Sequence, residues 1–302
     1  MNIRVVRSFT LTLISLLSLL GFAAQAGAQG NVSKQLNVSP KLRGRTGNTH
    51  KAQVKAAGTA SGYSVLYSFC SAPNCTDGEQ PRAGLIQDAA SNLYGTTAYG
   101  GANTAANGGY GGGTVFKLGS TGQETVLYSF CSATNCTDGS GALDGGLIQD
   151  AAANLYSTTT SGGADGLGTA FKLDDTGHET ALYSFCSAAN CADGAIPAAG
   201  LIQDASGNLY GTTNNGGNST NDSSCPENPD LGCGTVFRVD SAGQETVLYS
   251  FCPAANCTDG DNPYGGLFQD SAGNLYGTAA FGGANTGAGP GGQGGWHGVR
   301  GG

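Results

Sequence analysis

The chain repeats one block of sequence four times, and this repetition constrains its fold more than any other feature. The pentapeptide Leu-Tyr-Ser-Phe-Cys begins at Leu66, Leu127, Leu182 and Leu248, so successive copies start 61, 55 and 66 residues apart. Each copy continues through a second cysteine and an Asp-Gly pair to Gly-Leu-(Ile/Phe)-Gln-Asp and Asn-Leu-Tyr. A unit of this kind buries its apolar face only against its neighbours. The sequence therefore predicts a stack of equivalent units.

Each full repeat contains four short strand patterns separated by turn residues. In the third full repeat they occupy residues 200–204, 208–213, 235–239 and 245–251. These segments are rich in β-branched and aromatic residues, and the Gly-Asn joint between the first two tolerates the positive φ of a tight hairpin. Four antiparallel strands per repeat are typical of a β-propeller blade. We therefore predict an all-β, β-propeller-like fold, with a β-solenoid as the alternative.

The repeat domain is expected over residues 61–286, with three complete blades and a partial fourth. The complete blades are predicted at about 84–130, 146–185 and 200–251, and the fourth combines 266–279 with the N-terminal strand 63–69. One strand is missing from this ring, because a Gly-rich tail at 287–302 stands where Gly-Thr-Val-Phe is expected. One interpretation is therefore a truncated or frame-shifted fragment of a longer repeat protein.

Residues 1–28 have the pattern of a secretory signal peptide. Arg4 and Arg7 precede an apolar run from Phe9 to Ala24, and small residues of the Ala-x-Ala type end it. The run is shorter than the roughly 20 residues that a membrane-spanning helix needs. The mature chain is therefore expected to be extracytoplasmic: secreted, periplasmic or associated with the cell surface.

The cysteines agree with export. Four pairs share a C-x4-C spacing, and a fifth pair lies in an insertion found in one repeat only: Cys70/Cys75, Cys131/Cys136, Cys186/Cys191, Cys252/Cys257 and Cys225/Cys233. An even number of cysteines at equivalent positions of an exported chain predicts disulfides. Metal binding is the alternative, but no histidine accompanies any pair.

Charge divides the chain into a basic arm and an acidic body. Residues 29–60, expected to be a disordered linker, carry six Lys or Arg residues and no acid. From residue 56 onward the chain has 21 acidic residues against five basic ones. An acidic body argues against nucleic-acid binding, because the phosphate backbone requires basic partners.

The blocks at 200–213 and 234–251 resemble the GloVer tandem repeat, which defines a family of bacterial "choice-of-anchor" exported proteins. The resemblance covers about residues 63–286. It implies an extracytoplasmic repeat protein, and it supplies no catalytic residue and no substrate.

The residues that most enzymes use are scarce or repeated. The three histidines, His50, His178 and His297, do not form a motif with a nucleophile, so we expect no catalytic residues. Acids at equivalent positions are first explained as turn residues. Four of them are candidate Ca2+ ligands, each with an Asn nearby: Asp77, Asp138, Asp193 and Asp259. Five acids are not repeated and nothing in the sequence pairs them: Asp165, Asp222, Glu227, Asp230 and Asp261.

The sequence favours a non-enzymatic binding or display scaffold without a cofactor, whose ligand is a glycan or an envelope protein. Its contact surface is expected at the insertion Asn214–Gly234, because loops on a rigid scaffold carry specificity. The alternative is a secreted propeller hydrolase or lyase that acts on polysaccharide. Non-repeated acids gathered at one site would favour that enzyme. The oligomeric state is not predicted.

Overall fold

The computed structural model describes residues 4–6, 64–103, 106–218, 225, 231–253, 257–283 and 297–301. The chain divides into two compact units, residues 1–8 with 62–302, and residues 9–61. The second unit lies outside the described residues, as do most of the signal peptide, the linker 29–60 and the greater part of the tail.

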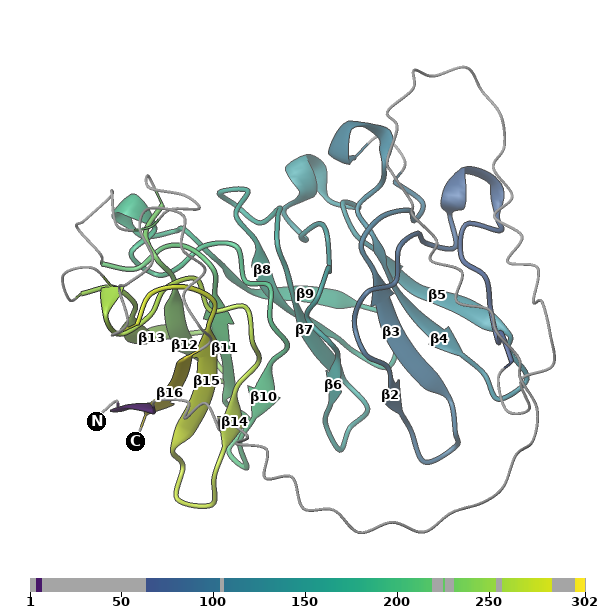
Figure 1. Ribbon diagram of the computed structural model, residues 1–302. Helices are drawn as coiled ribbons and strands as arrows, with labels where there is room; N and C mark the ends of the chain where they lie inside the picture. The colour runs from purple at the N-terminus through teal and green to yellow at the C-terminus, as the bar shows by residue number, and fades with distance from the viewer. Residues whose placement is uncertain are drawn as a thin grey trace, which may run out of the picture. The chain divides into compact units, whose positions relative to one another are not determined.

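Four antiparallel sheets of four strands each make up the first unit, and they follow one another along the chain (Figure 1). Blade 1 contains β2 (Ile86–Gln87), β3 (Leu93–Thr97), β4 (Thr114–Leu118) and β5 (Glu124–Ser129). Blade 2 contains β6 (Ile148–Gln149), β7 (Leu155–Thr159), β8 (Thr169–Leu173) and β9 (Glu179–Ser184). Blade 3 contains β10 (Ile202–Gln203), β11 (Leu209–Thr213), β12 (Thr235–Val239) and β13 (Glu245–Ser250).

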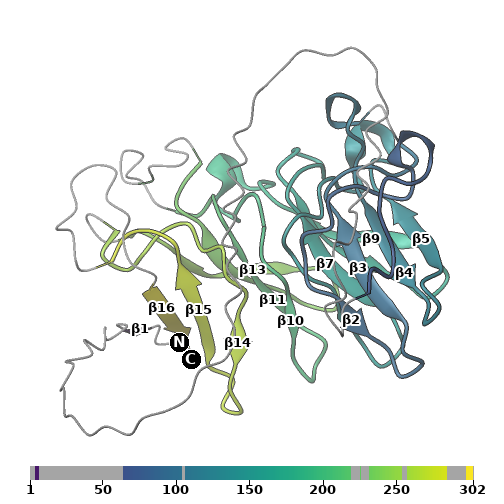
Figure 2. The ribbon, with the colours of Figure 1, turned by 45° about the vertical axis from the view of Figure 1, so that its right-hand side comes forward.

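Blade 4 is assembled differently from the other three. It contains β14 (Phe268–Gln269), β15 (Leu275–Ala279), β16 (His297–Gly301) and β1 (Arg4–Val6), in the order β1-β16-β15-β14 (Figure 2). The sequence placed the segment 63–69 in this sheet. Instead, residues 64–68 belong to no strand, and the Gly-rich tail supplies β16. The outermost strand, β1, comes from the segment predicted to be a signal peptide.

The hairpins are built by turn chemistry that the repeats share. In blade 4, Asp270 Oδ1 accepts hydrogen bonds from the Ala272 and Asn274 amides, both 2.9 Å long. Its Oδ2 accepts from the Asn274 side chain at 2.7 Å and from the Tyr276 hydroxyl at 2.9 Å. The Asn274 side chain and these other donors lower the pKa of Asp270 to about 2. Asp88, Asp150 and Asp204 make the same set of bonds, which confirms that these acids close turns.

Successive blades share hydrophobic cores. Phe130, at the end of blade 1, meets Phe171 of blade 2 edge-on with 5.0 Å between ring centroids. Phe185 of blade 2 meets Phe237 of blade 3 at 4.8 Å in the same way. Three core clusters join blades 1 and 2, 2 and 3, and 3 and 4, and none among the described residues joins blade 4 to blade 1. The fold is therefore all-β with propeller-like blades, as predicted, but the sheets do not close a ring.

Five disulfides close short loops: Cys70–Cys75, Cys131–Cys136, Cys186–Cys191, Cys225–Cys233 and Cys252–Cys257. A set of disulfides this large is typical of extracytoplasmic proteins. Within the part of the chain described, no helix has the length and hydrophobicity needed to cross a bilayer.

Candidate functional site

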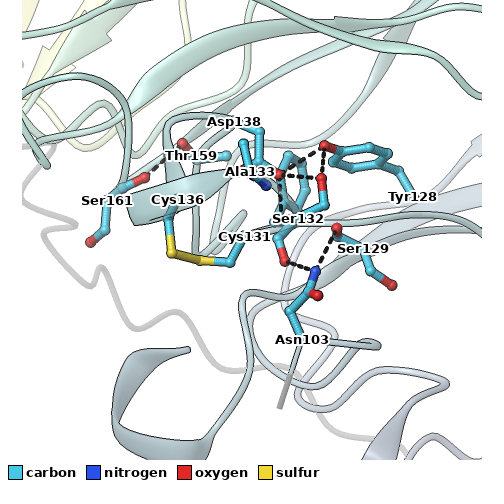
Figure 3. The surroundings of a disulfide bond; sticks show 11 residues. Asn103, Tyr128, Ser129, Cys131, Ser132, Ala133, Cys136, Asp138, Thr159 and Ser161 are labelled. Atoms are coloured by element: carbon cyan, nitrogen blue, oxygen red, sulfur yellow. Dashed lines mark hydrogen bonds between the residues drawn. A yellow bond between two sulfur atoms is a disulfide. The ribbon is translucent and has the colours of Figure 1, made fainter. Parts of the chain in front are cut away.

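A hydrogen-bonded carboxylate lies behind each C-x4-C disulfide loop. In Figure 3, Asp138 Oδ2 accepts from the Tyr128 hydroxyl at 2.8 Å and from the amide and hydroxyl of Ser132 at 2.8 and 2.9 Å. Oδ1 accepts from the Ala133 amide at 3.2 Å. Asp77 and Asp193 make equivalent bonds. N–H and O–H donors point at both oxygens of these candidate Ca2+ ligands, so the carboxylates are satisfied by the loop itself.

A glutamate of the following blade lies beside each of these three carboxylates. The buried Oε1 of Glu179 has no hydrogen-bond partner in the described chain. Burial, and second the negative charge of Asp138, raise the pKa of Glu179 to about 7. The same two causes raise the pKa of Glu124, beside Asp77, and of Glu245, beside Asp193, to about 7. Because this arrangement occurs three times, it belongs to the blade interface rather than to a single active site.

The fourth carboxylate, Asp259, departs from this pattern. Its Oδ2 accepts from the Tyr249 hydroxyl at 2.7 Å and from the Cys252 amide at 2.9 Å. Pro253 stands where the other copies have a serine, and Asp259 Oδ1 has no partner among the described residues. The junction of blades 3 and 4 is therefore chemically different from the other two junctions.

Four polar side chains are buried at this junction, and we call them the polar cluster: Asn214, Asn215, Asp261 and Asn262. Each is at most 5% exposed. Backbone hydrogen bonds fix all four residues. The backbone N–H of Asn262 donates to the Cys233 carbonyl at 2.8 Å. The backbone N–H groups of Asp261 and Asn215 donate to the carbonyls of Phe281 and Ala195, both at 3.0 Å. The Asn215 side chain also donates to the Gly232 carbonyl at 3.3 Å. The cluster thus surrounds the base of the insertion 214–234.

The equivalent positions in the other blades show that the cluster is not part of the repeat. Where blade 4 has Asp261 and Asn262, the earlier repeats have Glu79-Gln80, Ser140-Gly141 and Ala195-Ile196. Where blade 3 has Asn214, the other blades have Ala98, Thr160 and Ala280. Blade 1 thus has the same carboxylate and amide groups in Glu79, which is half-buried, and Gln80, which is exposed, whereas blades 2 and 3 fold without them.

The polar cluster retains unused hydrogen-bonding capacity. The buried Oδ1 atoms of Asn214 and Asn262 have no hydrogen-bond partner in the described chain. A buried amide oxygen without a partner costs roughly 1–3 kcal/mol, so native proteins keep few of them. Amide and carboxylate oxygens suit the hydroxyl groups of a substrate or a hard cation such as Ca2+. Asn214, Asp261 and Asn262 are the residues that could hold such a cation.

Two disulfides adjoin the polar cluster. The sulfur atoms of Cys233, Cys252 and Cys257 lie within 4.8 Å of one another, and all three residues are buried. Each is paired, Cys233 with Cys225 and Cys252 with Cys257, so none offers a thiolate to a metal. Each disulfide closes its own loop, and the two pack in the hydrophobic core shared by blades 3 and 4.

Of the residues singled out from the sequence, the structure brings Asp261 to this junction and leaves others apart. Asp165 and His178 are exposed, and the His178 amide donates to the turn carboxylate of Asp174 at 2.9 Å. His50, Asp222, Glu227 and Asp230 lie outside the described residues, and so does the side chain of His297. Sequence reasoning missed Asn214 and Asn262, although aligning the repeats residue by residue exposes both.

Several solved structures are similar to the chain. A gluconolactonase from Xanthomonas campestris is 16% identical with a TM-score of 0.39, and 72% of this chain aligns with 55% of it. A luciferin-regenerating enzyme is 14% identical with a TM-score of 0.40, over 72% and 59% of the two chains. A glucose dehydrogenase-type oxidoreductase from Thermus thermophilus is 13% identical with a TM-score of 0.37, over 67% and 58%. The chain thus spans a little over half the length of each.

These similar structures are enzymes, and this finding corrects the expectation of a non-enzymatic scaffold. That expectation rested on the scarcity of histidine and on the repetition of the acids. Propeller-like blades also carry enzymes, however, and carboxylates alone can supply acid–base chemistry. The similarity assigns neither an activity nor a residue to this chain.

The family comparison is more specific. No curated protein matches the chain. The family model of the Gloeobacter/Verrucomicrobia repeat matches residues 46–225 and 104–290, which together include all three complete blades and strands β14 and β15 of the fourth. These are the blocks on which the resemblance to the GloVer repeat rested. The chain therefore belongs to the Gloeobacter/Verrucomicrobia repeat family.

Proposed function

We propose that the chain is an extracytoplasmic hydrolase of a carbohydrate, with the polar cluster between blades 3 and 4 as its active site. The predicted signal peptide at residues 1–28 and the five disulfides support a location outside the cytoplasm. A glycan, expected from the sequence as a bound partner, becomes the substrate class in this proposal. Its many hydroxyl groups match the amide and carboxylate groups of the cluster.

One observation carries the proposal. Asp261 is 2% exposed, whereas its equivalent in blade 1, Glu79, is half-buried. Asp261 lies at the junction that also buries Asn214 and Asn262, whose Oδ1 atoms have no partner in the described chain. Polar groups left unsatisfied in a buried position lower stability and persist where they serve a function. At the other junctions the aspartates of the C-x4-C loops are satisfied, and the unpartnered glutamate oxygens recur in all three of those copies, whereas the buried group of Asn214, Asp261 and Asn262 occurs once.

In this proposal Asp261 acts as the general base. Its carboxylate accepts a proton from water as the water oxygen bonds to the electrophilic carbon. The bond between that carbon and the departing oxygen breaks, and the departing oxygen takes a proton from solvent. Asn214 and Asn262 position the substrate by accepting hydrogen bonds from its hydroxyl groups. The burial of the cluster strengthens these interactions, because the local dielectric constant is low.

The test uses the mature protein and chromogenic glycosides, with reducing-sugar release from soluble polysaccharides as a second assay. We expect Asp261→Asn to lower the hydrolysis rate by about 100-fold or more, the usual effect of removing a general base. Glu79→Gln is the matched control, because Glu79 occupies the equivalent position in blade 1 and makes the same kind of backbone bridge. Equal loss in both variants, or no hydrolysis by the parent protein, would overturn the proposal.

A further inference from the structure

The three blade interfaces within the chain are built alike, from two different faces. At the junction of blades 1 and 2, the face of the earlier blade contributes Ile86, Tyr94, Val115, Leu127 and Phe130. We call this the trailing face of a blade. The later blade contributes its leading face, which contains Leu147, Leu155, Phe171 and Leu173. Every junction therefore joins one trailing face to one leading face.

The first and last blades each leave part of one of these faces uncovered. Leu85, on the leading face of blade 1, is 48% exposed, whereas its equivalents Leu147 and Leu201 are each 3% exposed. Phe268, on the trailing face of blade 4, is 65% exposed. Its equivalents in the other blades, Ile86, Ile148 and Ile202, pack against the next blade. The two open faces are thus the complementary halves of an interface that the chain already forms three times.

The segment 64–69 shows what belongs on the leading face of blade 1. Phe69 contacts Phe116 of that face with 4.6 Å between ring centroids, like Phe130 on Phe171 at the next junction. The Tyr67 hydroxyl donates to Asp77 at 2.8 Å, as Tyr128 does to Asp138. The segment therefore lies where the outer strand of a preceding blade would lie, yet residues 64–68 belong to no strand.

The fourth blade, by contrast, lacks an outer strand from the repeat domain. Its outer position beside β16 is filled by β1, residues Arg4–Val6, which lie within the predicted signal peptide. Cleavage of that peptide would leave the backbone of β16 unpaired on its outer edge. An unpaired edge accepts a further strand through main-chain hydrogen bonds.

We propose that mature chains associate head to tail. The leading face of blade 1 in one copy covers the trailing face of blade 4 in the next. The segment 64–69 of the first copy then adds as a strand beside β16 of the second, and completes its fourth blade. Because the two surfaces differ, the contact is heterologous and produces open filaments or rings rather than symmetric dimers.

The experiment measures the mass of the mature protein, residues 29–302, by light scattering and sedimentation at concentrations from about 1 to 100 µM. We expect the mass to rise with concentration. Leu85→Glu blocks one face and Phe268→Glu the other, so each variant alone remains monomeric. Both side chains are exposed, so neither substitution disturbs the buried core.

Mixing the two variants tests the heterologous geometry. Each retains the face that the other has lost, so an equimolar mixture forms a dimer and nothing larger. Tyr110→Glu is the control, since Tyr110 is 66% exposed and its equivalents do not contribute to the blade interfaces. A parent protein that is monomeric throughout would overturn the proposal and indicate closure within one chain. Variants that associate like the parent, or a mixture without a dimer, would also overturn it.

Discussion

Two regions of the molecule bury polar side chains, and they differ in whether the buried atoms have hydrogen-bond partners. One is the set of aspartates behind the C-x4-C loops, and the other is the polar cluster between blades 3 and 4. Asp138 is buried, and both of its oxygens accept hydrogen bonds from its own loop. Asn214 and Asn262 are equally buried but keep unpartnered Oδ1 atoms. Satisfied groups specify a structure, whereas unsatisfied ones lower stability. The comparison separates residues that build the blade from residues that the blade carries.

Removing a satisfied carboxylate should have the largest effect on stability. Asp138→Ala leaves the Tyr128 hydroxyl and two backbone amides without an acceptor, so we expect the free energy of unfolding to fall by about 3–5 kcal/mol. Asn214→Ala removes an unpartnered oxygen and introduces the residue found at Ala98 and Ala280, so its effect should be within about 1 kcal/mol. Denaturant titration measures both. Similar losses in the two variants would contradict the comparison.

The disulfides provide a second contrast between the two regions. Replacing both cysteines by serine at Cys131–Cys136 or at Cys225–Cys233 should lower the free energy of unfolding by about 2 kcal/mol in each case, because both loops are short. The second change alone should lower hydrolytic activity, since Cys233 accepts the backbone bond that holds Asn262. Unfolding curves and the glycoside assay distinguish the outcomes. An equal activity loss in both double variants would remove the distinction.

Stability should depend on pH through the three interface glutamates. The ordinary pKa of glutamate, 4.5, is raised to about 7 in Glu179. The folded state therefore holds a proton that the unfolded chain releases, and this contribution is full below pH 4.5 and lost as the pH rises through 7. After allowance for solvent screening, Glu179→Gln should stabilise by about 1–2 kcal/mol at pH 8 and by nothing at pH 4.

A pH series of thermal melts checks this effect. The pKa of Asp270 is lowered from 3.8 to about 2, so its contribution to stability is full above pH 3.8 and is lost as the pH falls through about 2. The pH of maximum stability should therefore lie near 4 to 5, where the glutamates are still protonated in the fold and Asp270 is ionised. A stability that rises from pH 5 to pH 8 would show that the glutamates are not buried as described.

The smallest effect concerns one turn position at which the blades differ. Ala153 in blade 2 has a φ of 64°, and its equivalent in blade 3 is Gly207 with a φ of 84°. A β-carbon on Gly207 would contact nothing within 4 Å, so the effect of a substitution there comes from the backbone conformation alone. Ala153→Gly should stabilise, and Gly207→Ala destabilise, by about 1 kcal/mol. Thermal melts of both variants measure the pair, and shifts of the same sign would contradict this explanation.

Much of the blade could be predicted from the sequence because its determinants are local. The alternation of strands and Gly-Asn turns locates β10 to within two residues and β11 to within one, and the C-x4-C spacing gives four of the disulfides. The fourth blade could not be predicted in the same way. Its outer strands pair residues almost 300 positions apart, Arg4 with Arg300, and no local pattern specifies such a partner.

The candidate site divides along the same line. Asp261 was visible in the sequence as a non-repeated acid, but nothing local indicated that it would be buried beside Asn262 and close to the insertion stapled by Cys225. Conversely, the sequence offers Asp138 as a candidate Ca2+ ligand, because carboxylates near an asparagine suit Ca2+, but favours a turn closed by the disulfide. The structure places Tyr128 and Ser132 on its oxygens instead.

The repeat by itself determined the class of fold, the number of blades with complete patterns and the positions of the turns, because hydrogen bonding and side-chain alternation act over a few residues. Only the tertiary structure decided which polar groups are satisfied and which blade faces remain open. Both depend on contacts between segments 30 to 70 residues apart, such as Thr212 with Gly265. Such contacts form only when one blade packs on the next.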